Sequence, residues 1–192
     1  MNKYKLVNNV KVYGLENSFR VSKFPMQVDT NKCNEEITDR IKKLAKCERG
    51  SGHDNFLKGI IVQFDLSFTV KAWTEAERYH FFDIVSSQSS MHRISKMDYN
   101  ECFYKHVTEN TKIEMEKLKE TYNSNPTQDN YLSLLYNCPT GLILTAGITT
   151  NYQQLKTIYA QRRNHRLPEW QDFCSWVETL PYAKELITFD KK

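Results

Sequence analysis

Long apolar runs are missing from the sequence. No stretch of about 18 consecutive apolar residues occurs in the chain, and no apolar run follows its first residues. A membrane-spanning helix needs such a stretch, and a secretion signal needs a shorter one near the N-terminus. We therefore expect neither membrane insertion nor secretion, and we expect a cytoplasmic protein.

Cysteine and histidine are too scattered to indicate a metal site or a disulfide framework. The five cysteines form no CxxC pair, and their odd number is typical of reduced thiols. The histidines other than His53 lack the spacing to cysteines or carboxylates that zinc ligands show. No metal is therefore expected. The scattered residues are Cys33, Cys47, Cys102, Cys138, Cys174, His80, His92, His106 and His165.

A strong excess of one charge is also missing. The chain has 27 basic and 23 acidic side chains, which gives a net charge of +4. This is compatible with a phosphate-bearing ligand, but it is far less than a protein that coats nucleic acid carries. Hydrophobic residues make up 40% of the 192 residues, and aromatic residues 12%, which is enough for a packed core. We expect a single domain that spans residues 1–192.

Apolar patterns along the chain predict an α+β fold. The segment 59–70 has apolar residues in alternation, and its length favours a central strand. Other strands are expected at 4–13 and 142–147. Helices are expected at 34–48 and 99–122 and from near residues 126, 150 and 168, whereas residues 17–25 are expected to be irregular.

One further helix is predicted after the central strand. Thr74 and Glu77 have the spacing of a capping box, in which two side chains satisfy free backbone amides. Phe81, Ile84 and Val85 would form the apolar face of this helix. It would end in the segment SSQSS at 86–90, because serine side chains compete for backbone hydrogen bonds.

The segment 150–162 carries the first candidate site. Thr150 and Gln153 form another capping box, and positions 151, 155, 158 and 162 then lie on one stripe of a helix. Leu155 and Ile158 would pack on the core. Asn151 and Arg162 would then lie about 16 Å apart on the same side of the helix. That distance suits a nucleotide or a flavin. Alternatively, Arg162 pairs with the last carbonyls of the helix, and Asn151 only occupies its first turn.

This segment resembles a motif of the flavin-dependent thymidylate synthases, the ThyX family. The sequence N-Y-Q-Q-L-K-T-I-Y-A-Q-R aligns without a gap with the family pattern N-A-R-x-L-x-x-F-x-x-L-R. Asn151, Leu155 and Arg162 match, whereas Gln153 replaces an arginine. The resemblance implies that Asn151 belongs to a flavin site and that Arg162 belongs to a nucleotide site.

The segment GHDNFLKG at 52–59 is similar to a second family pattern, G-H-[ED]-[ST]-P-x-E-H. Gly52, His53 and Asp54 match, and Asn55 replaces the small hydroxyl residue. The resemblance implies that His53 and Asn55 contact the flavin. The residues alone also allow a plainer role, in which His53 caps the preceding helix.

A third family pattern, R-H-R-x-x-S-x-x-x-x-S-x-R, is only partly present. With its last arginine on Arg93, Ser86 falls on the first serine and Ser90 lies one residue from the second. Hydroxyls and an arginine suit phosphate oxygens, and Gln88 suits the edge of a uracil ring. We therefore predict a nucleotide site here. The alternative is a polar turn with Arg93 in solvent.

The first half of the third pattern is lost. In the family, an Arg-His-Arg segment binds the flavin, and this sequence has Phe81, Phe82 and Asp83 in its place. Arg78 is the nearest basic residue that could take its place, about one turn before Phe81 on the predicted helix.

The resemblance also implies an activity and an assembly. In the family, a homotetramer with active sites built from several subunits transfers a one-carbon unit from methylenetetrahydrofolate to dUMP, a methyltransferase reaction. FAD carries the reducing equivalents, which NADPH supplies. Because the Arg-His-Arg is missing, a second hypothesis is a non-catalytic nucleotide-binding protein on the same fold. A third is a basic patch at residues 162–166 that binds nucleic acid, although no stacking aromatics are interleaved there.

Overall fold

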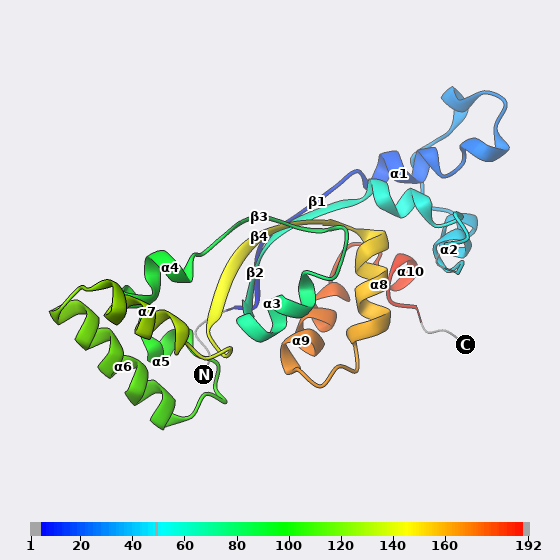
Figure 1. Ribbon diagram of the computed structural model, residues 1–192. Coiled ribbons are helices and arrows are strands. Elements are labelled where there is room, and N and C mark those ends of the chain that lie inside the picture. The colour runs from blue at the N-terminus through cyan, green and yellow to red at the C-terminus, as the bar shows by residue number, and fades with distance from the viewer. Residues whose placement is uncertain (1–4, 49, 190–192) are drawn as a thin grey trace.

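The computed structural model describes residues 5–48 and 50–189 (Figure 1). Within them, four strands form one antiparallel sheet in the order β1-β2-β4-β3, and no helix is long and apolar enough to cross a membrane. In chain order the elements are β1 (Val7–Tyr13), α1 (Leu15–Val21), η1 (Phe24–Met26), η2 (Thr30–Lys32), α2 (Asp39–Ala45), η3 (Asn55–Gly59), β2 (Ile61–Thr69), α3 (Val70–Ala76), β3 (Phe82–Ser87), α4 (Ser90–Arg93), η4 (Ile94–Lys96), α5 (Tyr99–Cys102), α6 (Glu109–Ser124), α7 (Gln128–Tyr136), β4 (Ile143–Asn151), α8 (Tyr152–Arg162), α9 (Pro168–Val177) and α10 (Ala183–Leu186).

β2 and β4 are the two central strands of the sheet. They are joined along their full length, from Ile61 opposite Asn151 to Thr69 opposite Ile143. β1 pairs with the other edge of β2, so the predicted central position of this strand is confirmed. Its alternating apolar residues are buried, because they face the helices that cover the sheet.

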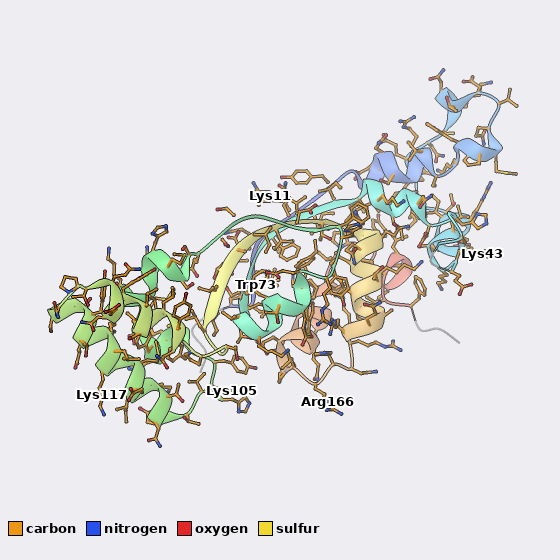
Figure 2. All side chains as sticks on the ribbon, viewed as in Figure 1. Lys11, Lys43, Trp73, Lys105, Lys117 and Arg166 are labelled. Carbon is orange, nitrogen blue, oxygen red and sulfur yellow. The ribbon has the colours of Figure 1, made fainter. Side chains whose placement is uncertain are left out.

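Helices α3, α8 and α9 cover one face of the sheet and leave the other face open (Figure 1). On the covered face, the ring of Phe68 lies 4.9 Å from that of Trp170 and 5.9 Å from that of Phe173, between centroids. Figure 2 shows Trp73 on this side and Lys11 on the open side. The predicted α+β class is therefore confirmed.

A second, smaller core lies in a lobe that comprises α4 to α7 at one end of the sheet (Figure 1). Tyr99 and Phe103 stack with ring centroids 4.9 Å apart, and Met115 and Leu134 pack in the same cluster. This lobe begins directly after β3, so it separates β3 from its partner β4 in the sequence.

The helix predicted after Thr74 is wrong in both its bounds and its face. Thr69, the last residue of β2, provides the cap instead, because its Oγ1 accepts a hydrogen bond from the backbone N–H of Ala72 at 3.2 Å. α3 therefore starts and ends earlier than predicted. The chain then returns as β3, which leaves Ile84 and Val85 exposed rather than on a helix face.

Several other predicted bounds change for local reasons. The helix predicted at 99–122 is split into α5 and α6, because Thr108 caps α6 by accepting from Thr111 N–H at 3.3 Å. Thr38 caps α2, which is shorter than the predicted helix at 34–48. The segment predicted to be irregular contains most of α1.

The remaining expectations agree more closely with the structure. The strand expected at 4–13 is confirmed as β1, with residue 4 outside the described residues. The strand expected at 142–147 is present as β4 but extends to Asn151. Helices do start near the expected residues 126, 150 and 168, and Pro168 opens the last of them, because proline needs no hydrogen bond to its nitrogen in a first turn.

Gly14 connects β1 to α1 in a conformation that other residues avoid. Its φ is 78°, and a Cβ there would collide with the carbonyl oxygen of Gly59. We expect Gly14→Ala to lower the free energy of unfolding by about 2 kcal/mol, measured by urea denaturation. Gly50→Ala is the matched control, because Gly50 has a φ of 85° but nothing within 4 Å of its Cβ position. Equal losses for the two variants would contradict the collision.

Candidate functional site

A groove runs along α8 and is formed by two adjoining hollows of about 630 and 420 Å³. His80, Gln154 and Thr157 line both hollows, so they join the two parts. We call this the α8 groove. Its other lining residues are Gly50, Gly52, Asn55, Lys58, Phe81 and Gln153 in the first hollow and Arg78, Tyr79, Gln161 and Arg162 in the second.

The periodicity of α8 divides its residues between the core and the groove. Leu155 and Ile158 are fully buried, so the predicted packing of that stripe is confirmed. Gln153, Thr157 and Gln161 follow one another at four-residue spacing and therefore share another face of the helix, which forms the floor of the groove. This face offers amides and a hydroxyl to a ligand.

Asn151 lies at the start of α8 and caps it. Its Oδ1 accepts a hydrogen bond from the backbone N–H of Gln154 at 2.9 Å. The capping box predicted from Thr150 and Gln153 is thus wrong by one residue, because β4 continues through Asn151 before the helix begins. The Asn151 side chain does not line the groove.

A buried ion pair fixes the loop that forms one wall of the groove. Lys156 Nζ lies 2.7 Å from Asp54 Oδ2 and also donates to the carbonyls of Ala45 and Cys47, at 2.6 and 2.9 Å. Asp54 Oδ1 accepts from Gln153 Nε2 at 2.9 Å. These contacts join residues 45–54 to α8, so the position of Gly50, Gly52 and Asn55 depends on them.

Arg162 lies at the far end of the groove in a network of its own. Its Nη1 lies 2.8 Å from Glu75 Oε2, and its Nε donates to the Tyr79 hydroxyl at 2.7 Å. The guanidinium also lies over the ring of Trp170, 5.1 Å from the centroid. These contacts orient Arg162 across the core side of α8, rather than toward the last carbonyls of the helix.

Glu75 is the acidic centre of that network. Burial raises the pKa of its carboxyl, but the hydrogen bond from Lys71 and the charges of His165 and Arg162 outweigh burial and hold the pKa below 4.5. His165 Nε2 lies 3.2 Å from Glu75 Oε2. Glu75 is therefore an anion at neutral pH and holds Arg162 in place.

The other nucleotide-site candidates lie away from the groove in the same chain. Ser86 and Gln88 are at the end of β3, and Gln88 extends the ladder, since its Oε1 accepts from Thr145 N–H at 2.9 Å. Ser90 and Arg93 are the ends of α4. Gln88 lies six positions after Phe82 along the extended chain, a distance of about 20 Å, and Phe82 directly follows the groove residue Phe81. One chain therefore does not bring these residues together with Arg162.

The flavin-site candidates are divided in the same way. Asn55 and Arg78 line the groove, whereas His53 is exposed in the loop before η3 and does not. Arg78 is not on a helix one turn before Phe81, as predicted, but in the turn after α3. The turn between α3 and β3 contains Arg78-Tyr79-His80, and Phe82 and Asp83 already belong to β3.

Some groove residues were not identified from the sequence as contacts, namely Lys58, His80, Gln154, Thr157 and Gln161. The four-residue spacing of polar residues on α8 is the sequence pattern that could have identified Thr157 and Gln161. No such pattern marks His80 and Lys58, because only the fold brings η3 and the α3–β3 turn to the same helix. Among residues 5–48 and 50–189, no group of three or more His, Cys, Asp or Glu is arranged to hold a metal ion.

The buried pair of Lys156 and Asp54 makes a first prediction about stability. Lys156→Met should lower the free energy of unfolding by about 3–5 kcal/mol, because it leaves the Asp54 carboxylate buried without its cation. The control is Lys42→Met, which removes an exposed pair with Asp39 and should cost less than about 1 kcal/mol. Urea denaturation that gives similar losses for both would show that the buried pair is not required.

The Glu75 network makes a second prediction, about pH. Its lowered pKa means that the network stabilises the fold above about pH 4.5 and that this stability is lost as the pH falls through the folded-state value. Glu75→Gln should cost about 2 kcal/mol at pH 7 in urea denaturation. The difference from wild type should shrink as the pH falls through the lowered pKa of Glu75, because both side chains are then neutral. A difference that stays constant with pH would contradict this, and exposed Glu77→Gln should have little effect throughout.

Solved structures of a known enzyme share this fold. A structure of the flavin-dependent thymidylate synthase ThyX from Helicobacter pylori, complexed with FAD and dUMP, aligns with a TM-score of 0.76 at 13% identity, over 96% of this chain and 98% of that chain. Another structure of ThyX from Helicobacter pylori with FAD and dUMP aligns with a TM-score of 0.77 at 14% identity, over 96% and 97%. No protein-family model matches the sequence, and no curated protein matches it. The resemblance inferred from the sequence motifs is therefore confirmed for the fold: this chain folds as ThyX does.

Proposed function

We propose that this protein is a flavin-dependent enzyme that transfers a one-carbon unit to dUMP or a related pyrimidine nucleotide. The observation that supports this most directly is the α8 groove, which combines amide and basic side chains on a fold whose solved examples bind FAD and dUMP. The role proposed for the groove is to hold the flavin and one end of the nucleotide.

The residues of the groove suit the chemistry of FAD. Lys58 and Arg78 supply cations for a diphosphate, and the imidazole of His80 adds an N–H donor. Asn55 and Gln153 offer amide groups to the polar edge of a flavin ring. When bound, the flavin supplies the reducing equivalents, which NADPH would provide, and methylenetetrahydrofolate would supply the carbon. The groove volumes are within the range of small-molecule sites.

The nucleotide side of the site is proposed to involve two subunits. Arg162 lies at one end of the groove, whereas Ser86, Gln88, Ser90 and Arg93 lie at the other end of β3, too far away to reach the same ligand. In a homotetramer, a second copy would bring these four residues to the groove. Ser86, Gln88 and Arg93 are exposed in a single chain and Ser90 is half-buried, which is compatible with this role.

A second candidate function is supported by a contact that already occupies a groove amide. Gln153 Nε2 donates to Asp54. This contact reduces what Gln153 offers to a flavin, which favours the non-catalytic nucleotide-binding protein. The nucleic-acid patch at residues 162–166 has less support, because Arg162 and His165 both turn toward Glu75 instead of forming one exposed surface.

The flavin provides the test between these functions. Purified protein should bind FAD, and Arg78→Glu should weaken that binding about tenfold or more, because a carboxylate replaces a cation beside the diphosphate. FAD fluorescence titration measures this binding. Arg40→Glu is the control, because Arg40 is an exposed residue of α2 and its replacement changes the charge by the same amount. Tight FAD binding that survives Arg78→Glu would show that the flavin does not bind in this groove. Binding of dUMP without any binding of FAD would favour the non-catalytic function over the enzyme.

A further inference from the structure

A cavity of about 600 Å³ lies between the sheet and the lobe, and it shares no lining residue with the α8 groove. Its walls come from β2, from the first two turns of α9, and from α6 and the chain before it. Figure 2 shows Lys105 where the lobe meets the rest of the chain. We call this space the sheet–lobe cavity. Six polar residues of its lining define it here, namely Ser67, Thr69, Lys105, Lys112, Glu169 and Asp172.

One wall of this cavity is acidic. Glu169 is only 5% exposed, and its Oε1 accepts a hydrogen bond from the Thr69 hydroxyl at 2.6 Å. In the part of the chain that the structure describes, no basic side chain forms an ion pair with it. Asp172 lies one turn further along α9 and lines the same space. A buried carboxylate with one hydroxyl partner is costly, so this wall favours a cation.

The charge of this wall also acts on a neighbouring group. Burial raises the pKa of the Tyr104 hydroxyl, and the charges of Glu169 and Asp172 raise it further. Tyr104 lines the cavity as well. The two carboxylates therefore direct their field into this space rather than only toward solvent.

The facing wall is basic. Lys105 is exposed, and Lys112, which is 24% exposed, lies 3.3 Å from Glu109 on its own helix. Among residues 5–48 and 50–189, neither lysine forms an ion pair with Glu169 or Asp172. The cavity thus keeps opposite charges on two walls that do not neutralise each other directly.

The first turn of α9 explains only part of this arrangement. A helix N-terminus favours a carboxylate in its first turn, and Glu169 occupies that position in α9. It does not explain the open volume, the second carboxylate or the two lysines on the opposite wall. A ligand with a charge of each sign at its two ends would satisfy all of them.

We propose that the sheet–lobe cavity binds a small zwitterion that carries a guanidinium or ammonium group at one end and a carboxylate at the other. The cation pairs with Glu169 and Asp172, and the carboxylate pairs with Lys105 and Lys112. The hydroxyl of Ser67, which now pairs with Thr145 Oγ1 at 2.7 Å, and that of Thr69 supply further polar contacts.

The test uses the full-length protein and three matched probes in titration calorimetry at low salt. L-arginine has both charged ends, agmatine lacks the carboxylate, and L-citrulline lacks the charge of the guanidinium. L-arginine should bind with a dissociation constant in the millimolar range or below, and each of the other two should bind about tenfold more weakly or not at all.

Two variants assign the binding to this cavity. Glu169→Gln should weaken L-arginine binding about tenfold or more, while the melting temperature stays within a few degrees of wild type or rises, because a buried charge is removed. Asp129→Asn is the control, since Asp129 also lies in the first turn of a helix but is exposed outside the cavity. It should bind L-arginine as wild type does.

Four results would overturn the proposal. They are no L-arginine binding at millimolar concentration, equal binding of L-citrulline and L-arginine, unchanged binding in Glu169→Gln, and equal weakening by Asp129→Asn. If Glu169→Gln fails to fold, Lys105→Met replaces it. Lys105 is exposed, so its removal should leave the fold intact and weaken L-arginine more than agmatine.

Discussion

The buried ion pair between Lys156 and Asp54 is the contact on which the candidate site depends. It joins the loop before η3 to α8, and three of its hydrogen-bond partners lie in residues 45–54. Without it, the loop before η3 would lose the contacts that hold Gly50, Gly52 and Asn55 beside α8, so the groove would lose one wall. The pair also uses Gln153 as a third member, which turns one groove amide toward the loop.

The same contact explains how the fold and the site are connected. β2 and β4 run the full length of the sheet, and β4 leads without a loop into α8 through the cap at Asn151. The helix is therefore held at both ends, by the sheet at its start and by Glu75 and Trp170 at Arg162. Asn151 and Arg162 do mark the two ends of the α8 segment, as the sequence predicted. In the single chain, however, their contacts are internal.

Strong periodic patterns made β2 and α8 predictable. The alternation in β2 and the pair Leu155 and Ile158 both report burial on one face, and that burial is what the structure shows. The region after β2 was not predictable in this way, because Thr69 and Thr74 are both suitable caps, and only the pairing of β3 with β4 selects the first. The lobe inserted between those two strands hides that pairing from any local pattern.

The candidate site was predictable only in its motif residues. Asn55, Arg78 and Arg162 line the groove. Lys58 and His80 line it as well, but no local sequence pattern marks them as groove residues. The sheet–lobe cavity was not foreseen, since it requires β2, α9 and the lobe to meet. The separation of Arg162, in the groove, from the proposed nucleotide residues at the end of β3 is likewise a property of the fold. The proposal of a second subunit rests on this separation.

A mixing experiment tests that shared site most directly. Arg93→Ala and Arg162→Ala each remove one half of the proposed nucleotide site, so each variant alone should bind dUMP poorly. Subunits of the two variants, unfolded together in equal amounts and refolded, should recover tight dUMP binding at about one site in four, because only sites that draw an intact half from each variant work. Calorimetric stoichiometry of the mixture measures this. No recovery from properly refolded mixed oligomers, or tight binding by either variant alone, would contradict a nucleotide site built from Arg162 of one subunit and Arg93 of another.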